Sequence, residues 1–501
     1  MTDHRFRVAL LLACLAGLSL GGYLLASWVM FRPGFPLDDA WIHQTYARNL
    51  AERGEWAFLP GQPSAGSTAP LWSLLLVFGY YIRLGPYIWT FLLGWGLLWA
   101  LAMVGADGFG VLLLDRHNLR VWAGVLLILE WHLVWSAGSG METLLMGLLI
   151  LVVLVWLVRL DSPETEGPPK GDWRKWFGIG GLIGLISWVR PDGLTLLGPL
   201  GWVLIMGKGT TKTKLRIAML AGVGFALGFL PYLLFNQALA GEWWPNTFYA
   251  KQAEYAALQE AAFWRRYLEQ ARLLIVGVGV LLLPGFTWFT WQSVRRRAWG
   301  VLGGILWVIG YLGIYAWRLP VTYQHGRYII PAVPVFILWG FTGLADLLHQ
   351  ESLIGKWRIV RPAVLMAVLA VVLAFWSLGA RAYALDVAVI ESEMVDTARW
   401  VAGNTDPESL IAAHDIGALG YFSKRSLLDL AGLISPEVIP YIRDEDAMAA
   451  YLDKQGADYL VTFPGWYPHL VNRATLIYTS SGRFSPLLNG ENMAIYAWIN
   501  P

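Results

Sequence analysis

The chain has 501 residues, of which 56% are hydrophobic and only 14% are charged. Charged residues make up about a quarter of a typical soluble protein, so this composition excludes one water-soluble globule and predicts an α-helical protein that crosses the membrane many times. The formal net charge of +2 gives no reason to expect a nucleic-acid partner.

The first predicted element is the apolar segment that follows MTDHRFR at the N-terminus. Its roughly 24 residues are too many for the apolar core of a signal peptide and enough to cross a bilayer. No small-residue cleavage site follows it, so we expect a retained first span. Arg5 and Arg7 precede this span and predict a cytoplasmic N-terminus.

An outer loop, residues 32–69, is predicted next, and it carries the adjacent carboxylates Asp38 and Asp39. Apolar side chains at helical spacing predict a short helix after them, with Asp38 placed to cap its start and Gly54 to end it. Two interpretations remain open. Either the acids only stabilise the helix start, or a carboxylate at the water–lipid boundary accepts a proton from a hydroxyl or binds a divalent cation.

Later apolar segments bring the predicted number of transmembrane helices to about 11 to 13. They lie near 70–84, 86–104, 105–114, 119–136, 141–159, 177–189, 193–207, 215–235, 272–292, 299–317, 328–348 and 362–380. The segment 105–114 is alternatively the end of a long helix that begins at 86. Basic residues such as Arg295, Arg296 and Arg297 cluster in alternate loops, as cytoplasmic loops do. An odd number of spans then places the C-terminal tail outside.

Charged residues recur at the predicted outer ends of these spans. They are Glu142 in GSGMET, Arg190 and Asp192 in SWVRPDG, Lys251 in WWPNTFYAKQ, and His325 and Arg327 in TYQHGRYIIP. A charge near lipid is costly and needs a partner. Local partners remain open for them: Asp192 for Arg190, a helix cap for Glu142, and interfacial anchoring for Arg327. The outer segment 236–271 around Lys251 is predicted to lie in the membrane interface.

Together these groups suit a polyprenyl-phosphate sugar donor. Cations would hold the phosphate as a leaving group, and an acid would activate the acceptor hydroxyl.

The tail, residues 381–501, is predicted to be a separate extracytoplasmic α/β domain after a membrane domain of residues 1–380. SLIAAHDIGALGYF predicts a strand and a turn, DEDAMAAYLDKQGADYLVTF a helix and a strand, and MAIYAWIN a last strand. His414, Asp415 and Asp429 fall at strand ends, where we interpret them as structural. The one cysteine, Cys14, lies in the first span, so no disulfide within the chain supports this domain.

The outer-loop sequence LDDAWIHQTYARNLAERGEWAFLPGQPSAGSTAPLW resembles that of the GT-C superfamily of membrane glycosyltransferases. Within it, the group with the mycobacterial terminal arabinofuranosyltransferase and a flagellar-motor control protein is most similar. SGMET, WVRPDG, PNTFYAK, HGRYIIP and AAHDIGALGYF follow in the same order. The resemblance implies an inverting glycosyltransferase that takes a sugar from a polyprenyl phosphate and transfers it to a glycan, lipid or protein outside the cell membrane.

The resemblance also implies roles for particular residues. The base would be Asp38 or Asp39, with a slight preference for Asp38, the first acid of the pair. The implied substrate-binding residues are His43, Tyr46, Arg48, Glu142, Arg190, Asp192, Asn246, Lys251, His325 and Arg327. A divalent cation (Mg²⁺, Mn²⁺ or Ca²⁺) is left open.

Two departures from the superfamily's pattern leave the sugar and the acceptor open. Residues 65–68 read Ala-Gly-Ser-Thr where many relatives have Glu-Gly-Tyr-Thr, and His43 stands where threonine or serine is common.

Two other classes of function remain as alternatives. A transporter or lipid flippase would show broken helices in matching halves of the chain, and the sequence shows no such symmetry. A non-catalytic envelope or motility assembly factor would keep only the fold.

Overall fold

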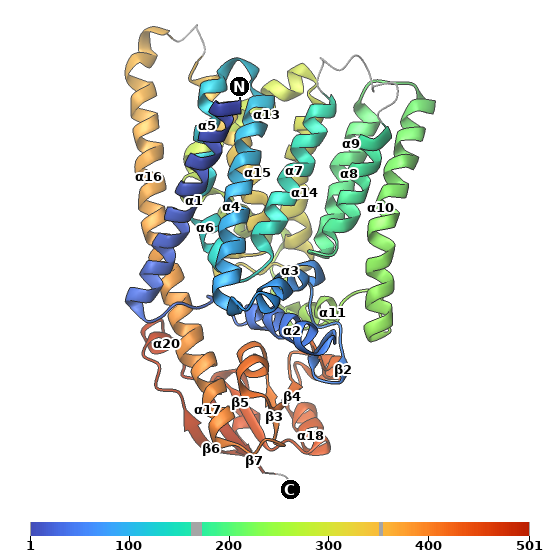
Figure 1. Ribbon diagram of the computed structural model, residues 1–501, viewed down its shortest axis with the longest axis vertical. Coiled ribbons are helices and arrows are strands. Elements are labelled where there is room, and N and C mark those ends of the chain that lie inside the picture. Colours follow the sequence, from blue (N-terminus) through green and yellow to red (C-terminus); the bar gives the residue numbers. More distant parts are fainter. Residues whose placement is uncertain (1, 162–172, 350–353, 500–501) are drawn as a thin grey trace.

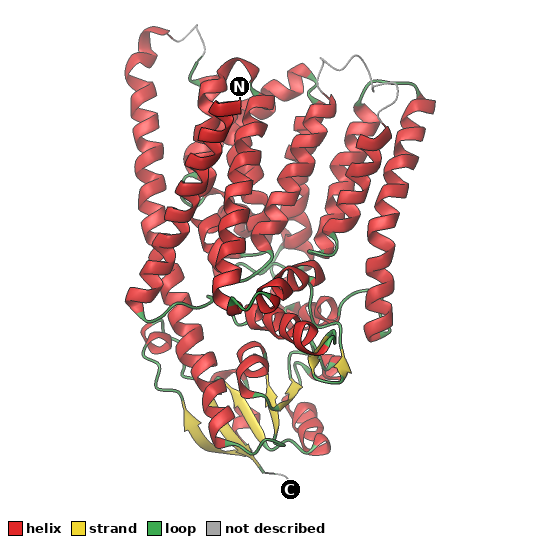
Figure 2. Cartoon of the chain, viewed as in Figure 1, coloured by secondary structure: helices red, strands yellow, loops and turns green. Residues whose placement is uncertain are grey.

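A computed structural model of the chain describes residues 2–161, 173–349 and 354–499. It shows an upright bundle of helices with a small sheet domain at one end (Figure 1). Helices make up nearly all of the bundle, and the main sheet lies in the C-terminal part (Figure 2). These features confirm the predicted α-helical membrane protein with a C-terminal α/β domain.

The first half of the chain contributes ten helices and a short hairpin. They are α1 (Thr2–Met30), α2 (Asp39–Arg53), β1 (Ala57–Leu59), β2 (Gln62–Pro63), α3 (Pro70–Tyr81), α4 (Gly85–Leu112), α5 (Arg120–Leu129), α6 (Trp131–Gly138), α7 (Thr143–Asp161), α8 (Trp173–Ile186), α9 (Leu197–Met206) and α10 (Thr211–Ala240). The bundle continues with α11 (Asn246–Glu254), α12 (Phe263–Ile275), α13 (Gly279–Arg296), α14 (Trp299–Arg318), α15 (Val333–Leu347) and α16 (Ile354–Val389).

Fewer helices than predicted have the length and composition of a membrane span. Within the described ranges seven qualify, or up to nine if each bent pair is one span. The segments 86–104 and 105–114 form the single helix α4, which is the alternative that the sequence left open. The segment near 70–84 yields only the 12-residue α3, which is too short to cross a membrane.

Two spans are broken, and neither break was predicted. Helices α5 and α6 meet at an angle of 59°, and α12 and α13 at 104°. At the first break Glu130 is extended, and its carboxylate accepts a hydrogen bond from the Leu133 N–H, which caps α6. At the second, Gly277 has a φ of +77°, a backbone conformation that favours glycine.

Helices α8 and α10 pack closely through glycines. A Cβ added to Gly180 of α8 would overlap the Ala221 carbonyl oxygen, and one on Gly224 of α10 would overlap that of Phe177. Small residues allow such close approach where helices associate in lipid.

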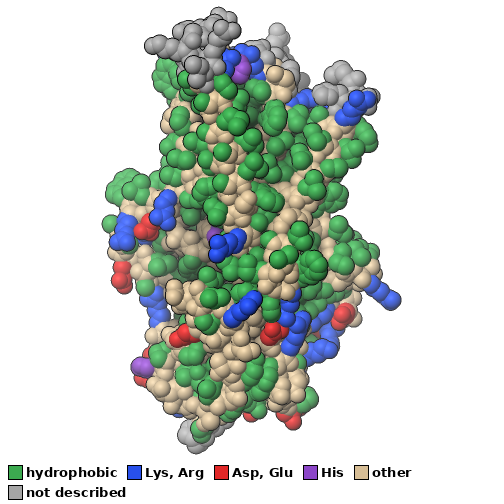
Figure 3. Space-filling view, turned by 90° about the vertical axis from the view of Figure 1, so that its left-hand side faces the viewer, with side chains coloured by type: hydrophobic (Ala, Val, Ile, Leu, Met, Phe, Trp, Pro, Cys, Tyr) green, Lys and Arg blue, Asp and Glu red, His purple; other side chains and the backbone are tan. Residues whose placement is uncertain are grey.

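Apolar side chains cover much of the bundle surface. On the face shown in Figure 3, hydrophobic side chains dominate the bundle, while many charged side chains gather toward the sheet domain. Helix α16 lies on that side and exposes Leu365, Met366, Leu369, Leu373 and Leu378. Water penalises such a surface and lipid does not, so the chain is a multi-pass membrane protein.

The C-terminal part holds a five-stranded sheet of order β4-β3-β5-β7-β6. Its elements are α17 (Asp396–Asn404), β3 (Leu410–Ala413), β4 (Ser426–Asp429), α18 (Glu445–Gln455), β5 (Tyr459–Thr462), α19 (Pro468–Asn472), β6 (Ala474–Thr479), α20 (Phe484–Leu487) and β7 (Ala494–Trp498). Strands β4, β3 and β5 are parallel, and β7 pairs antiparallel with β5 and with β6. The predicted strands around 410, 460 and 495 and the helix before Gly456 are all present.

The two parts of the chain are joined by a continuous helix. Helix α16 passes the predicted boundary at 380–381 and ends at Val389, where a π-helical turn leads into α17. Arg32, which follows α1, clamps this junction through ion pairs with Glu391 at 2.6 Å and Asp396 at 2.7 Å. Because Glu391 is almost fully buried, the pairing with Arg32 compensates its charge.

Candidate active site

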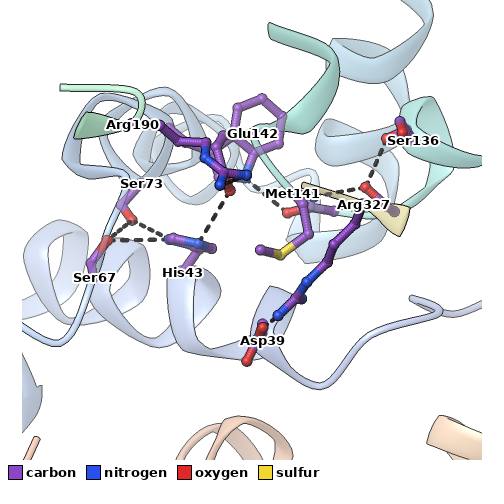
Figure 4. Close-up of polar contacts among 12 residues, drawn as sticks. Asp39, His43, Ser67, Ser73, Ser136, Met141, Glu142, Arg190 and Arg327 are labelled. Atoms are coloured by element: carbon purple, nitrogen blue, oxygen red, sulfur yellow. Dashed lines mark hydrogen bonds and ion pairs between the residues drawn. The ribbon is translucent and has the colours of Figure 1, made fainter. Parts of the chain in front are cut away.

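Asp39 and Arg327 form an ion pair at the end of the bundle that faces the sheet domain (Figure 4). The Asp39 Oδ2 lies 2.6 Å from Arg327 Nη1, and the Asp39 side chain keeps 30% of its surface exposed. Burial opposes ionisation, but the charges of Arg327 and Lys251 outweigh it and hold the pKa of Asp39 well below its usual range. Asp39 is therefore a carboxylate at neutral pH.

A cavity of about 320 Å³ opens beside this pair. Its charged lining residues are Asp39, Glu142, Arg190, Asp192, Lys251, Arg318 and Arg327, and apolar side chains such as Trp244, Phe248, Ile314 and Leu319 complete the wall. We call it cavity 1. It combines a cluster of cations with an apolar wall, as a lipid-linked phosphate requires.

Arg190 is compensated within cavity 1. Its Nε lies 3.1 Å from Asp192, its Nη1 lies 3.6 Å from Glu142, and its Nη2 donates to the Tyr315 hydroxyl at 2.8 Å. Asp192 in turn accepts hydrogen bonds from Tyr311 and Tyr315. The local partner Asp192 is thus present, and Glu142 faces Arg190.

His43 links two departures from the superfamily's pattern. Its Nδ1 lies 3.2 Å from the Ser67 hydroxyl and 3.1 Å from that of Ser73, and its Nε2 lies 3.6 Å from Glu142 (Figure 4). Ser67 belongs to the unusual Ala-Gly-Ser-Thr stretch, so the two altered positions contact each other. Burial lowers the pKa of His43, which favours a neutral ring.

A second cavity, of about 600 Å³, lies between the bundle and the sheet domain. We call it cavity 2; its charged and titratable lining residues are Asp38, Asp39, Lys251, Glu254, Tyr255, Tyr323, Arg327, His414, Asp415, Arg443 and Tyr467. Asp39, Lys251 and Arg327 line both cavities. The ion pair between Asp39 and Arg327 therefore stands where the two cavities meet.

The Asp38 side chain contacts the sheet domain and does not cap α2 as the sequence predicted. Its side chain makes no capping bond to α2, and its two oxygens accept hydrogen bonds from the Gly417 and Ala418 N–H groups at 2.7 and 2.8 Å. Burial and the charges of Asp415 and Asp39 raise the pKa of Asp38 against these bonds. Gly54 ends α2 as predicted, with a φ of +72°.

Four predicted substrate-binding residues line neither cavity. Tyr46 hydrogen-bonds to Ser64 at 2.6 Å, Arg48 donates to the Tyr421 carbonyl at 2.7 Å, Asn246 donates to the Leu433 carbonyl at 3.3 Å, and His325 pairs with Asp386 of α16 at 2.7 Å. These contacts hold loops and helices together around the site. A role of these four residues in substrate binding stays a prediction.

Arg318, at the end of α14, is a lining residue that the sequence interpretation missed. Its guanidinium lies 5.7 Å from the ring centre of Phe248, and with the Gln252 amide oxygen turned toward it, its Nη2 donates at 2.6 Å. The sequence WRLP could have indicated Arg318, because this arginine ends an apolar segment, and Arg190 and Arg327 also adjoin apolar segments.

Two residues of the sheet domain extend the polar wall of cavity 2. The His414 Nδ1 shares a hydrogen bond with the Tyr467 hydroxyl at 2.7 Å, and its Nε2 lies 3.6 Å from Glu254. Burial opposes the charged imidazole, yet the contacts with Glu254 and Asp415 raise the pKa of His414 to about 9. Among the residues that the structure describes, no group of three or more His, Cys, Asp or Glu side chains is arranged to hold a metal ion.

Solved structures of two other proteins have a similar architecture. The crystal structure of ArnT from Cupriavidus metallidurans bound to undecaprenyl phosphate superposes with a TM-score of 0.59 at 16% identity and covers 97% of each chain. The Archaeoglobus fulgidus oligosaccharyltransferase in complex with Zn and sulfate superposes with a TM-score of 0.62 at 11% identity, over 98% of this chain and 73% of that one. Both are GT-C membrane glycosyltransferases. The chain has the GT-C fold.

The shared fold agrees with the predicted GT-C architecture, while the narrower likeness to the mycobacterial group stays a prediction. ArnT in the apo state gives a similar TM-score of 0.58 at 15% identity. A protein-family model described as a domain of unknown function (DUF8728) matches residues 381–496. No curated protein matches the sequence.

Proposed function

We propose that the chain is an inverting glycosyltransferase that moves a sugar from a polyprenyl phosphate in the membrane to an acceptor hydroxyl on the outer side. The observation that carries this proposal is the position of Asp39, an ionised carboxylate where a cationic, partly apolar cavity meets a second cavity. A lipid-linked donor fits cavity 1 and an acceptor fits cavity 2. The N-terminus would then be cytoplasmic and the sheet domain extracytoplasmic.

The proposed reaction is a single displacement at the anomeric carbon. The acceptor oxygen attacks from the side of cavity 2 and forms the new glycosidic bond, while the bond from the anomeric carbon to the phosphate oxygen breaks. Its electron pair stays with the polyprenyl phosphate, and the hydroxyl proton passes to Asp39. Arg327 holds Oδ2 of Asp39, so Oδ1 is the oxygen that we assign to the proton. This geometry favours Asp39 over Asp38, whose two oxygens are held by backbone N–H groups.

The phosphate is assigned to Lys251 and Arg318. Arg190 is compensated by Asp192 and Glu142, and Arg327 by Asp39. Lys251 instead donates to the Tyr328 hydroxyl at 2.9 Å, and Arg318 faces Gln252. Within the described ranges neither of the two forms an ion pair with a carboxylate, so both keep charge for an anionic ligand.

Removing either cation is expected to weaken donor binding. Lys251→Gln and Arg318→Gln should each raise the KM for the polyprenyl-phosphate sugar by about tenfold, because a hydrogen bond to a charged group contributes about 1.5–3 kcal/mol. Steady-state kinetics with purified protein and varied donor would measure this. Arg265→Gln is the matched control, since that side chain is 76% exposed and lines neither cavity. Unchanged donor KM in both variants would remove the phosphate assignment.

The function itself is tested in the cell envelope. Mass spectrometry of envelope glycans from a strain that lacks the gene should show one glycan that has lost one sugar residue. Wild-type protein should restore that sugar and the Asp39→Asn variant should not. If the chain were a non-catalytic assembly factor, the wild-type protein and the Asp39→Asn variant would both restore the sugar. Envelope glycans that the deletion leaves unchanged would contradict the proposal.

A further inference from the structure

Cavity 2 lies at the carboxyl ends of the three parallel strands of the sheet domain. His414, Asp415 and Ile416 follow β3, Ala431 and Leu433 follow β4, and Phe463, Trp466 and Tyr467 follow β5; all of them line the cavity. The carboxyl ends of parallel strands meet at one edge of the sheet, and ligands of α/β sheets bind in the crevice beyond that edge. The strand order β4-β3-β5 places β3 in the centre of this crevice.

An exposed aromatic ring stands beside hydrogen-bonding side chains in this crevice. Trp466 keeps 49% of its surface exposed although it lines the cavity, and its ring lies edge-on to His414 at 5.2 Å. Asp415 faces the same space, and its Oδ2 is buried without a hydrogen-bond partner among the described residues. A buried acceptor without a partner needs a donor from a ligand or water. Arg443, an exposed cation, completes the polar wall.

We propose that cavity 2 binds a carbohydrate acceptor, with a sugar ring against Trp466 and ring hydroxyls bonded to Asp415 and Arg443. An aromatic ring offers an apolar surface to the C–H face of a sugar, while the carboxylate and guanidinium bond to its hydroxyls. This inference rests on the proposed function, since it names the acceptor class for the same site.

The alternative of a peptide acceptor fits the sheet less well. Extended peptides commonly add a strand to an exposed sheet edge. Here the edge strands are β4 and β6, whereas the residues that line cavity 2 follow the ends of strands and do not run along an edge. A peptide is therefore kept as an outcome of the test.

Saturation-transfer NMR on the full chain in detergent micelles tests this inference without any donor. The probes are neutral tetrasaccharides of glucose, galactose, mannose and arabinose, and a serine- and threonine-rich peptide. At least one tetrasaccharide should receive saturation from the wild-type protein. Trp466→Ala should reduce that signal about fivefold, as the loss of one aromatic contact implies. Trp466→Tyr, which keeps an aromatic face, should retain most of it. Trp264→Ala is the matched control, because Trp264 is 73% exposed and lines neither cavity.

Three outcomes would overturn the carbohydrate proposal: no tetrasaccharide signal from the wild-type chain, an equal signal from Trp466→Ala, or a signal from the peptide alone. Asp415→Asn separates a folding defect from a lost contact, because asparagine keeps the shape of the aspartate side chain. This variant should also give a weaker signal. Failure of the proposed function looks different. If Asp39→Asn kept full transfer activity, the assigned reaction would be wrong, while saccharide binding at Trp466 would still be observed.

Discussion

Sugar transfer is expected to fall by about a thousandfold when Asp39 is replaced by asparagine, the scale of a lost general base. The amide keeps the shape of the side chain but cannot accept the hydroxyl proton, and it no longer balances the charge of Arg327 at 2.6 Å. The fall should appear in kcat, since the carboxylate acts mainly in the transition state. A radiolabelled polyprenyl-phosphate sugar and purified protein would provide the assay.

Two further variants sharpen this test. Asp446→Asn, on an exposed turn of α18, should leave the rate unchanged. Asp38→Asn should lose much less in kcat than Asp39→Asn, because the Asp38 oxygens are occupied by the Gly417 and Ala418 N–H groups. If Asp38→Asn were inactive while Asp39→Asn kept its rate, the base would be Asp38, as the sequence alone slightly favoured.

Gly417→Ala is expected to destabilise the contact between the sheet domain and the bundle by about 1–3 kcal/mol, the usual cost of an overpacked site. A Cβ at this position would overlap the Asp38 carbonyl oxygen and stand 2.6 Å from its Oδ2. Both neighbours are held in place, because the first belongs to the backbone and the second belongs to a carboxylate that accepts two hydrogen bonds. We expect a lower thermal midpoint, faster proteolysis of the sheet domain, and a large loss of transfer activity.

Gly403→Ala provides the matched control. Gly403 lies in α17 of the same domain, and a Cβ there meets no atom within 4 Å. Alanine also favours a helix more than glycine does, so this variant should be as stable as the wild type or slightly more stable. Equal stability of the Gly417 and Gly403 variants would show that the contact at Asp38 does not hold the domain.

Much of the fold could be predicted because its signals are local. Apolar segments mark membrane helices, and the strand and helix patterns of the tail predict its α/β domain without knowledge of its packing. The breaks at Glu130 and Gly277 were missed because each depends on one residue inside an otherwise continuous apolar stretch. Apolar segments of 17 or fewer residues also form helices in this bundle, as α3 shows, so an apolar segment does not by itself establish a membrane span.

The candidate site was predictable in composition and less so in its contacts. The sequence analysis grouped Asp39, Arg190, Lys251 and Arg327 because each is a charge at a predicted helix end near lipid. All four line cavity 1. The partner of Asp38 could not be read from local spacing, since it lies 379 positions away at Gly417. For the same reason His325, which looks like a site residue beside Arg327, contacts Asp386 of α16 instead.

We propose that a lipid-linked phosphate binds in cavity 1 with its sugar directed toward Asp39. A cryo-EM structure of the chain with a saturating polyprenyl-phosphate sugar would test this placement. Phosphate density is expected within hydrogen-bonding distance of Lys251 and Arg318, with the anomeric carbon between Asp39 and cavity 2. Phosphate density at the opposite end of the bundle, or a bound sugar directed away from Asp39, would contradict it.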